Sequence, residues 1–371
     1  MSSRASKCPW VSAALLGAVA CVPPQEDPSR EIPPITWSGA QLDYAPQPGA
    51  YELCAGTLPY MDRYVALVAD AMGMEIDQPL VYVHGSEDGE TFCEHEGTLG
   101  CSFDDSVYSR VAPQEHEIVH GVRGWQGFSH LFFEEGTAEV FGDDAPLAFR
   151  VPSNGDLLEG VMAASRERGL PTHWYPRAGH FVAYLHERYG PEPTAALLQE
   201  TNAFSSPDRA IEVLEDVTGL PWAEIQENYE TQPECDQAHY RYPLYGCEEP
   251  TALRPRCDGV ETVWISERVA CDDPTTLGPR DGEIWKSIAV EIPVDGEYLF
   301  FSYVEEGAAG ATITIEECSM GCGSIVLEES MGLVLPLERV LLRAGRYALR
   351  LTRPVEAPAT VELSISGPDC E

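Results

Sequence analysis

Residues 113–141 read PQEHEIVHGVRGWQGFSHLFFEEGTAEVF, and this stretch decides how the rest of the chain is interpreted. It contains the pattern HEIVH, in which His116 and His120 are four residues apart. Residues i and i+4 of a helix lie on the same face, so both imidazoles can reach one metal ion. Glu117 lies beside them, where its carboxylate can accept a proton from water. The pattern therefore predicts a zinc site on a short helix over residues 114–122, with Glu117 as general base.

A catalytic zinc site needs a third protein ligand and one open coordination position. The arrangement HExxHxxGxxH is excluded, because Arg123 and Gln126 stand where its glycine and its third histidine would be. The segment LFFEEGTAEV (131–140) offers carboxylates instead, with fourteen residues between His120 and Glu135. The apolar residues of this segment predict a buried helix, and a buried carboxylate needs a partner such as a metal ion.

The segment 131–140 resembles the third-ligand motif of the gluzincin metallopeptidases, in which an acidic ligand precedes Gly and a small residue, as in WLNEGFA of the aminopeptidases. The resemblance implies that Glu135 is the third ligand, that Glu134 is its neighbour, and that Glu139 accepts a hydrogen bond from a ligating histidine. It covers about residues 57–229. It implies a gluzincin-type domain, built from a small mixed sheet and a helical subdomain, with Zn²⁺ as cofactor.

Residues 175–185 (YPRAGHFVAYL) resemble the aminopeptidase stretch in which a tyrosine precedes Lys-Gly-Ala at the start of a helix. This resemblance implies that Tyr175 stabilises the oxyanion of the tetrahedral intermediate. His173 and His180 are the alternative oxyanion donors. The other histidines have no motif around them and are predicted to be structural or surface residues: His84, His95, His130, His186 and His239.

Two features separate the chain from the aminopeptidases that it resembles. The spacing from His120 to Glu135 is shorter than theirs, and no GAMEN-like segment is present to bind the free amino terminus of a substrate. We therefore expect hydrolysis of peptide bonds by an endopeptidase, acting on a peptide or protein substrate. The alternative is a surface-displayed binding lipoprotein whose peptidase domain is a relic.

Beyond about residue 250 the sequence changes character. Short alternating runs such as SIAVEI, EYLFFSY and RYALRL are separated by Gly, Pro and Asp turns, which is typical of a β-sandwich. With several helical segments before residue 235, the chain is predicted to be α+β, with a peptidase domain over residues 37–234 and a disulfide-containing sandwich over residues 235–371.

The N-terminus predicts export. Two basic residues precede an apolar stretch over residues 11–20 that has the length of a signal peptide core. The sequence AVAC (18–21) suits either an ordinary signal peptidase or a bacterial lipobox, and we favour lipidation of Cys21. The Pro-rich segment 22–36 would then be a tether between membrane and domain.

Ten of the twelve cysteines follow the leader sequence. This even number agrees with a protein whose cysteines pair as disulfides in an oxidising compartment. Sequence proximity suggests local disulfides, although connectivity cannot be derived from sequence. The suggested pairs are Cys93–Cys101, Cys235–Cys247, Cys257–Cys271 and Cys318–Cys322, with Cys54 and Cys370 left to pair with each other.

The charge is strongly negative, with 61 acidic against 23 basic residues and a formal net charge of -38. Such a surface repels phosphates and anionic lipids, so nucleic acid is excluded as a partner, and membrane contact is expected only through an N-terminal lipid. Neutral or basic substrates are favoured. The sequence does not indicate an oligomeric state.

Overall fold

The computed structural model describes residues 31–89, 91–93, 98–103, 106–124, 127–142, 157–164, 169–248, 263–304, 311–324, 326–331 and 338–367. The predicted signal peptide, the predicted lipidation site Cys21 and most of the Pro-rich tether lie outside these residues. His95, Cys257 and Cys370 also lie outside them. The fold of the described part is mixed α and β, as predicted, and Pro33–Glu371 form one compact unit.

A small mixed sheet forms the first β part of the chain. Its strands are β1 (Trp37–Ser38), β2 (Leu42–Pro46), β3 (Leu80–His84), β4 (Gly100–Phe103) and β5 (Ser106–Ser109). The strand order is β1-β2-β3-β5-β4, in which β2, β3 and β5 are mutually parallel neighbours. Strand β4 is antiparallel to β5 and lies at the edge of the sheet. The side of β4 that faces away from β5 therefore has no strand partner within the described residues.

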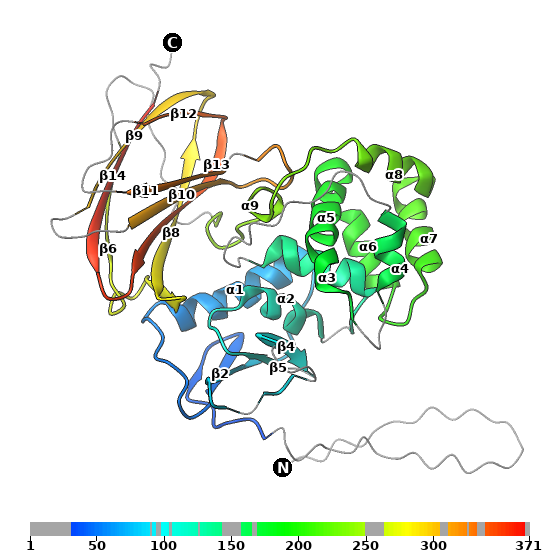
Figure 1. Ribbon diagram of the computed structural model, residues 1–371, viewed down its shortest axis with the longest axis horizontal. Coiled ribbons are helices and arrows are strands. Elements are labelled where there is room, and N and C mark those ends of the chain that lie inside the picture. The colour runs from blue at the N-terminus through cyan, green and yellow to red at the C-terminus, as the bar shows by residue number, and fades with distance from the viewer. Residues whose placement is uncertain are drawn as a thin grey trace, which may run out of the picture. The chain divides into compact units, whose positions relative to one another are not determined.

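The first two helices pack against this sheet and the later ones form a helical region, drawn from blue to green in Figure 1. Their bounds are α1 (Thr57–Met72), α2 (Glu115–Gly124), α3 (Leu131–Phe141), α4 (Leu157–Ala163), the 3₁₀ turn η1 (Thr172–Trp174), α5 (Tyr175–Tyr189), α6 (Glu192–Glu200), α7 (Pro207–Thr218), α8 (Trp222–Glu230) and α9 (Gln237–Tyr240). Helices α1 and α2 share a core with β2, β3 and β5, whereas α3 and α5 share a second core with α6, α7 and α8. Helices α3, α5 and α6 contribute residues to both cores and therefore tie them together.

The remaining strands form two further sheets, coloured yellow to red in Figure 1, which we call the C-terminal β region (263–366). They are β6 (Val263–Val269), β7 (Leu277–Arg280), β8 (Glu283–Ile292), β9 (Gly296–Val304), β10 (Ala311–Glu317), β11 (Val326–Met331), β12 (Glu338–Leu342), β13 (Gly345–Pro354) and β14 (Ala359–Ser366). The strand orders are β11-β10-β13-β8-β7 and β12-β9-β14-β6. Alternating side chains from both sheets meet in one apolar core, which explains the period-two pattern of the sequence.

Among the described residues, three disulfides link the C-terminal β region to segments that precede residue 250, and this corrects most of the predicted pairs. Only Cys93–Cys101 has the predicted partner. The other bonds are Cys54–Cys271, Cys235–Cys322 and Cys247–Cys318, with sequence separations of 217, 87 and 71 residues. The local pairs were wrong because folding brings the β10–β11 turn and the segment before β7 against distant parts of the chain. A disulfide needs Cβ atoms about 4 Å apart, which sequence proximity alone does not provide.

The four disulfides indicate an extracellular or periplasmic protein, because such bonds persist in oxidising compartments. Within the described residues, none of the helices combines the length and the apolar character that crossing a bilayer requires.

Candidate metal centre

Helix α2 carries the two predicted histidine ligands. Acidic residues occupy its first turn and Arg123 its last, which suits the helix dipole at both ends. The helix is almost entirely buried, and Val119 and Val122 anchor it in the core shared with α1. The rings of His116 and His120 lie edge to face, with centroids 4.9 Å apart, so the helical period places them on one face as expected.

Helix α3 brings Glu135 to the same face. The Oε2 atom of Glu135 lies 3.2 Å from Nε2 of His120 and 3.3 Å from Nε2 of His116. The two Nε2 atoms are 3.2 Å apart. Three donor atoms from two helices therefore form a nearly equilateral triangle. The predicted ligands lie together within the described residues.

The size of this triangle suits a tetrahedral zinc ion. Zinc ligands lie about 2.0–2.2 Å from the ion, and two ligands at tetrahedral angles are then about 3.3–3.6 Å apart. The observed sides of 3.2–3.3 Å are close to the lower end of this range. Two imidazoles and one carboxylate are also a common donor set for catalytic zinc. The residues present therefore fit Zn²⁺ in both distance and chemistry.

Each of the two candidate ligand histidines has a carboxylate near its other ring nitrogen. Oε1 of Glu139 lies 3.7 Å from Nδ1 of His116, and Oε1 of Glu134 lies 4.0 Å from Nδ1 of His120. Carboxylates in these places orient the imidazoles and make their Nε2 atoms more basic. Glu139 lies beside His116, and its predicted role as hydrogen-bond acceptor for a ligating histidine stays a prediction. Glu134, which was regarded only as a neighbour of Glu135, has the matching place beside His120.

Glu134 is completely enclosed, with its negative charge balanced by nearby groups. Its Oε2 accepts hydrogen bonds from the backbone N–H and the hydroxyl of Ser129, at 2.9 and 2.7 Å. Its Oε1 lies 3.4 Å from Nε of the equally buried Arg123. Burial alone would raise the pKa of Glu134, but His120 and Arg123 hold it below its ordinary value. The carboxylate therefore stays ionised beside His120.

The centre attracts positive charge. Burial opposes protonation of His116, but the Glu135 carboxylate outweighs burial and raises the pKa of His116 to about 9. Burial likewise opposes protonation of His120, and again Glu135 raises the pKa well above the ordinary value. In return, the two imidazoles hold the pKa of Glu135 far below its usual range despite its burial. A site that stabilises protons this strongly also stabilises a cation in their place.

Glu117 and Tyr175 lie beside the three donors. The Glu117 side chain packs against Gly100 of β4 so closely that a Cβ at position 100 would lie 2.7 Å from its Cγ. Tyr175 begins α5, and its ring stacks on that of His116 at a centroid distance of 6.0 Å and an interplanar angle of 6°. Burial raises the pKa of the Tyr175 phenol, and Glu135 and Glu117 raise it further. Tyr175 therefore remains a protonated hydrogen-bond donor.

A cavity of about 1260 Å³ extends over the donors, and its walls come from distant parts of the chain. The edge strand β4 contributes Gly100, Cys101 and Ser102, while Tyr175 lines the same space. Arg280 and Asp281 reach the cavity from the β7–β8 turn of the C-terminal β region. Sequence reasoning missed this wall, because no local pattern connects residues 280–281 with a helix more than 150 positions earlier.

The two alternative oxyanion donors have different surroundings. His173 lies in η1 and lines the cavity, so it remains a candidate. His180 is not part of the cavity lining, and this alternative was wrong. Its Nδ1 pairs with the hydroxyl of Tyr229 at 2.9 Å, and its Nε2 lies 3.2 Å from the carbonyl oxygen of Pro233. Tyr175 and His180 both lie on α5 but face different surroundings: Tyr175 lines the cavity, whereas His180 packs between α5 and α8.

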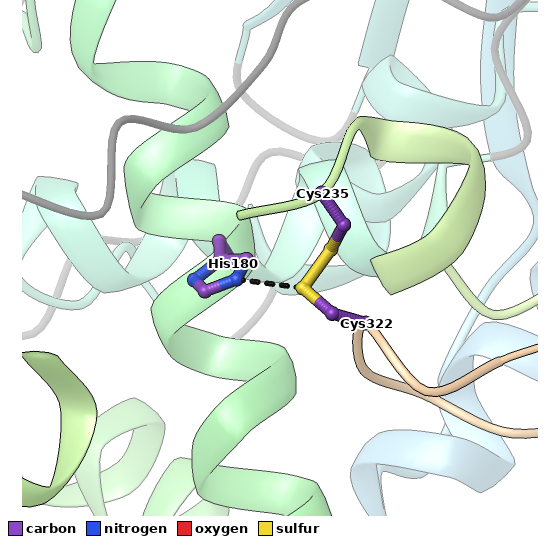
Figure 2. Close-up of side chains that lie close together, drawn as sticks. All are labelled: His180, Cys235 and Cys322. Carbon is purple, nitrogen blue, oxygen red and sulfur yellow. Dashed lines mark hydrogen bonds between the residues drawn. A yellow bond between two sulfur atoms is a disulfide. The ribbon is translucent and has the colours of Figure 1, made fainter. Parts of the chain in front are cut away.

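His180 belongs instead to a second group of three potential ligands, shown in Figure 2. Its Nε2 lies 2.9 Å from Sγ of Cys322, which forms a disulfide with Cys235. Thiolates, rather than disulfide sulfurs, are the forms of cysteine that bind metals. In its disulfide form this group is therefore a cross-link beside a buried histidine.

Three of the other histidines make structural contacts: His84 and His130 are buried, and His186 is partly buried. Nδ1 of His84 lies 2.6 Å from the hydroxyl of Tyr44, while His130 and His186 pack against Phe133 and Phe141. Burial lowers the pKa of all three imidazoles to about 4. His239 is partly exposed and pairs with Asp236. None of these four lines the cavity.

Comparison with known proteins returns only distant likenesses. No family profile matches the chain, and no curated protein matches it. Among solved structures, the pre-peptidase C-terminal domain of a collagenase from Bacillus anthracis is 12% identical, with a TM-score of 0.24 over 31% of this chain and 93% of that one. A carbohydrate-binding module from Cellvibrio mixtus lichenase 5A is 19% identical, with a TM-score of 0.19 over 30% of this chain and 92% of that one. Similarity at this level does not inform the function.

Proposed function

We propose that this protein is an exported zinc-dependent peptidase of the gluzincin kind, with a peptidase domain followed by a β-sandwich. The observation that carries the proposal is the triangle of Nε2 of His116, Nε2 of His120 and Oε2 of Glu135, with sides of 3.2–3.3 Å. Two imidazoles and a carboxylate that are buried this close together need a shared cation to offset their desolvation, and a metal ion supplies one. The carboxylates of Glu134 and Glu139 support it by orienting both imidazoles.

His116, His120 and Glu135 would hold the zinc ion. When bound, zinc lowers the pKa of water to about 7 and polarises a carbonyl group. Glu117 would then accept a proton from the attacking water and pass it to the leaving amine, which a buried carboxylate at the cavity wall can do. Tyr175 would donate its phenolic hydrogen to the developing oxyanion.

The edge strand β4 supports an extended peptide as the substrate. Gly100–Phe103 pair with β5 on one side, and Gly100, Cys101 and Ser102 line the cavity. An extended peptide can add to such an edge through main-chain hydrogen bonds, whatever its side chains are. Endopeptidase action is favoured over removal of single terminal residues because the sequence has no GAMEN-like segment to bind a free amino terminus.

The decisive experiment compares the purified protein with Glu117→Gln and with Glu224→Gln, an exposed glutamate on α8 that serves as control. Zinc content is measured by mass spectrometry and hydrolysis with a mixture of quenched fluorescent peptides. We expect about one zinc ion in all three proteins. Hydrolysis should be lost by a factor of about 10²–10⁴ in Glu117→Gln alone.

Two outcomes would contradict the proposal. If the purified protein binds no stoichiometric zinc even after zinc is supplied, the proposed metal centre is contradicted. Hydrolysis that persists in Glu117→Gln would remove the proposed general base. Stoichiometric zinc with no hydrolysis of any peptide would favour a binding protein with a relic centre.

A further inference from the structure

The β7–β8 turn of the C-terminal β region forms one wall of the cavity that holds the metal centre. Strands β7 and β8 are antiparallel, and the turn between them passes through Asp281 and Gly282, whose φ values are 51° and 81°. Arg280 and Asp281 line the same cavity as His116 and Glu117. A residue of the C-terminal β region is therefore within reach of a substrate bound at the metal centre.

This turn is held in place by contacts with α1 and α2. The Cys54–Cys271 disulfide joins the segment before α1 to the segment before β7. The hydroxyl of Thr57, the first residue of α1, donates to the carbonyl oxygen of Gly278 at 2.9 Å, and the N–H of Gly278 donates back at 3.0 Å. Such covalent and hydrogen-bonded links make the turn a permanent part of the cleft.

Arg280 provides the link to the metal helix. Its Nη1 lies 3.0 Å from Oε2 of Glu115, which is 0% exposed and immediately precedes His116. The hydroxyl of Tyr60 donates to the other oxygen of Glu115 at 2.8 Å. The charge of Arg280 is therefore largely neutralised by Glu115 and is not available to a substrate.

Asp281 differs from its neighbour. It is exposed at the cavity wall, and no ion pair or hydrogen bond to its carboxylate occurs within the part of the chain that the structure describes. The other cavity carboxylates lie around the metal centre, where Glu134, Glu135 and Glu139 contact the histidines. Asp281 is thus a fixed negative charge that faces the space a substrate would occupy.

We infer that Asp281 makes the cleft select peptides with a lysine or arginine side chain near the scissile bond. This inference rests on the proposed peptidase function and gives the C-terminal β region a direct part in substrate recognition. An ammonium or guanidinium group beside Asp281 would gain an ion pair, whereas an acidic side chain there would be repelled. The net charge of -38 acts in the same direction by attracting basic peptides.

The test uses a series of peptides that are identical except for one residue, which is lysine, norleucine or glutamate. In successive peptides this residue is placed at each position on either side of the cleaved bond. Asp281→Asn is the main variant, because Asn is the closest match in shape and tolerates a positive φ. Asp216→Asn is the control, because Asp216 is an exposed residue of α7 that does not line the cavity. The readout is the ratio of kcat/KM for the lysine peptide to that for the norleucine peptide.

We expect the wild type and Asp216→Asn to prefer lysine at one position, and Asp281→Asn to lower this preference about fivefold, the size of one partly exposed ion pair. The lysine preference of the wild type should also shrink at high salt, and that of Asp281→Asn should not. A preference that is equal in wild type and Asp281→Asn would overturn the inference.

A binding measurement separates this inference from the proposed function. In the Glu117→Gln background, fluorescence anisotropy compares affinity for the lysine and norleucine peptides with and without Asp281→Asn. An affinity preference that depends on Asp281 supports the inference even if the wild type cleaves nothing, which would contradict only the peptidase proposal. Cleavage by the wild type without dependence on Asp281 in either assay overturns the inference alone.

Discussion

Two groups of three potential metal ligands occur among the residues that the structure describes, and one of the two has the surroundings of a metal centre. In the first, His116, His120 and Glu135 come from α2 and α3 and line a cavity. In the second, His180 comes from α5 and lies beside the Cys235–Cys322 disulfide. In both groups the donor atoms lie within 4.8 Å of one another, so proximity does not distinguish them.

The difference lies in what the donor atoms contact. Each Nδ1 of the first group faces a carboxylate, and each Nε2 faces the shared centre. In the second group the sulfurs are bonded to each other, and Nδ1 of His180 pairs with the neutral hydroxyl of Tyr229. A metal centre therefore needs anionic partners behind its ligands and access from solvent, in addition to ligands that lie close together.

The largest expected effect separates the two groups by metal content. His120→Ala should lower bound zinc from about one ion per chain to almost none, because two ligands do not hold zinc in competition with a chelator. Replacing both Cys235 and Cys322 by serine should leave zinc unchanged but lower the free energy of unfolding by about 2–4 kcal/mol. Mass spectrometry and urea unfolding provide the two measurements. Zinc loss in the double serine variant would show that the second group binds metal.

The next effect tests the side chain that lies over the first group. Tyr175→Phe should lower kcat by about 10²–10³ with little change in KM or zinc content, because an oxyanion donor acts mainly in the transition state. Tyr189→Phe, at the other end of α5, is the matched control and loses only a hydroxyl contact with Tyr184. A kcat equal to wild type in Tyr175→Phe would leave His173 as the remaining predicted donor.

A smaller effect concerns the groups behind the histidines. Glu139→Gln should weaken zinc binding about 10–100-fold, because it removes the negative charge that lies 3.7 Å from Nδ1 of His116. Tyr229→Phe removes the corresponding partner of His180 and should leave zinc affinity unchanged. Competition with a fluorescent chelator measures both. Equal zinc affinities in the two variants would mean that the carboxylate beside His116 contributes nothing to metal binding that the hydroxyl beside His180 does not.

The smallest effect is the pH dependence of stability in chelator-treated protein, which has opposite signs for the two groups. Burial lowers the pKa of His180 to about 4, below the unfolded value of about 6.5. The contribution of His180 to the free energy of unfolding is therefore complete above about pH 6.5 and is lost as the pH falls towards 4. Despite burial, Glu135 raises the pKa of His116 to about 9, so its contribution is complete below about pH 6.5 and is lost as pH rises towards 9.

Urea unfolding across this pH range, with His180→Gln and His116→Gln as variants, measures the two contributions. His180→Gln should reduce the pH dependence of the free energy of unfolding below about pH 6.5, and His116→Gln should reduce it above about pH 6.5. An effect of His180→Gln confined to alkaline pH would show that burial does not control this histidine.

Local chemistry made much of the site predictable. The four-residue spacing of His116 and His120 needs only the helical period, and the apolar residues around Glu135 indicated a buried helix. The alternating runs after residue 250 were likewise sufficient to predict strands, because one face of each sheet is buried. The roles carried over from the gluzincin resemblance remain predictions.

Non-local contacts were not predictable. Residues 271, 318 and 322 find their disulfide partners across 71–217 positions, and Arg280 reaches Glu115 from a separate sheet. Neither kind of contact leaves a periodic pattern or a motif in the sequence. For the same reason, the place of Glu134 beside His120 became evident only when α2 and α3 were seen to pack together.

By itself, the sequence determined which residues can share a helix face or a strand face, because these depend on periods of 3.6 and 2 residues. It thereby determined the pair of histidines, the adjacent Glu117 and the change from helices to strands. Only the tertiary structure decided that Glu135 meets the histidines, that His180 faces a disulfide and that a turn near residue 281 borders the cleft. Those outcomes depend on how whole elements pack, and packing sums many weak contacts between residues far apart in the chain.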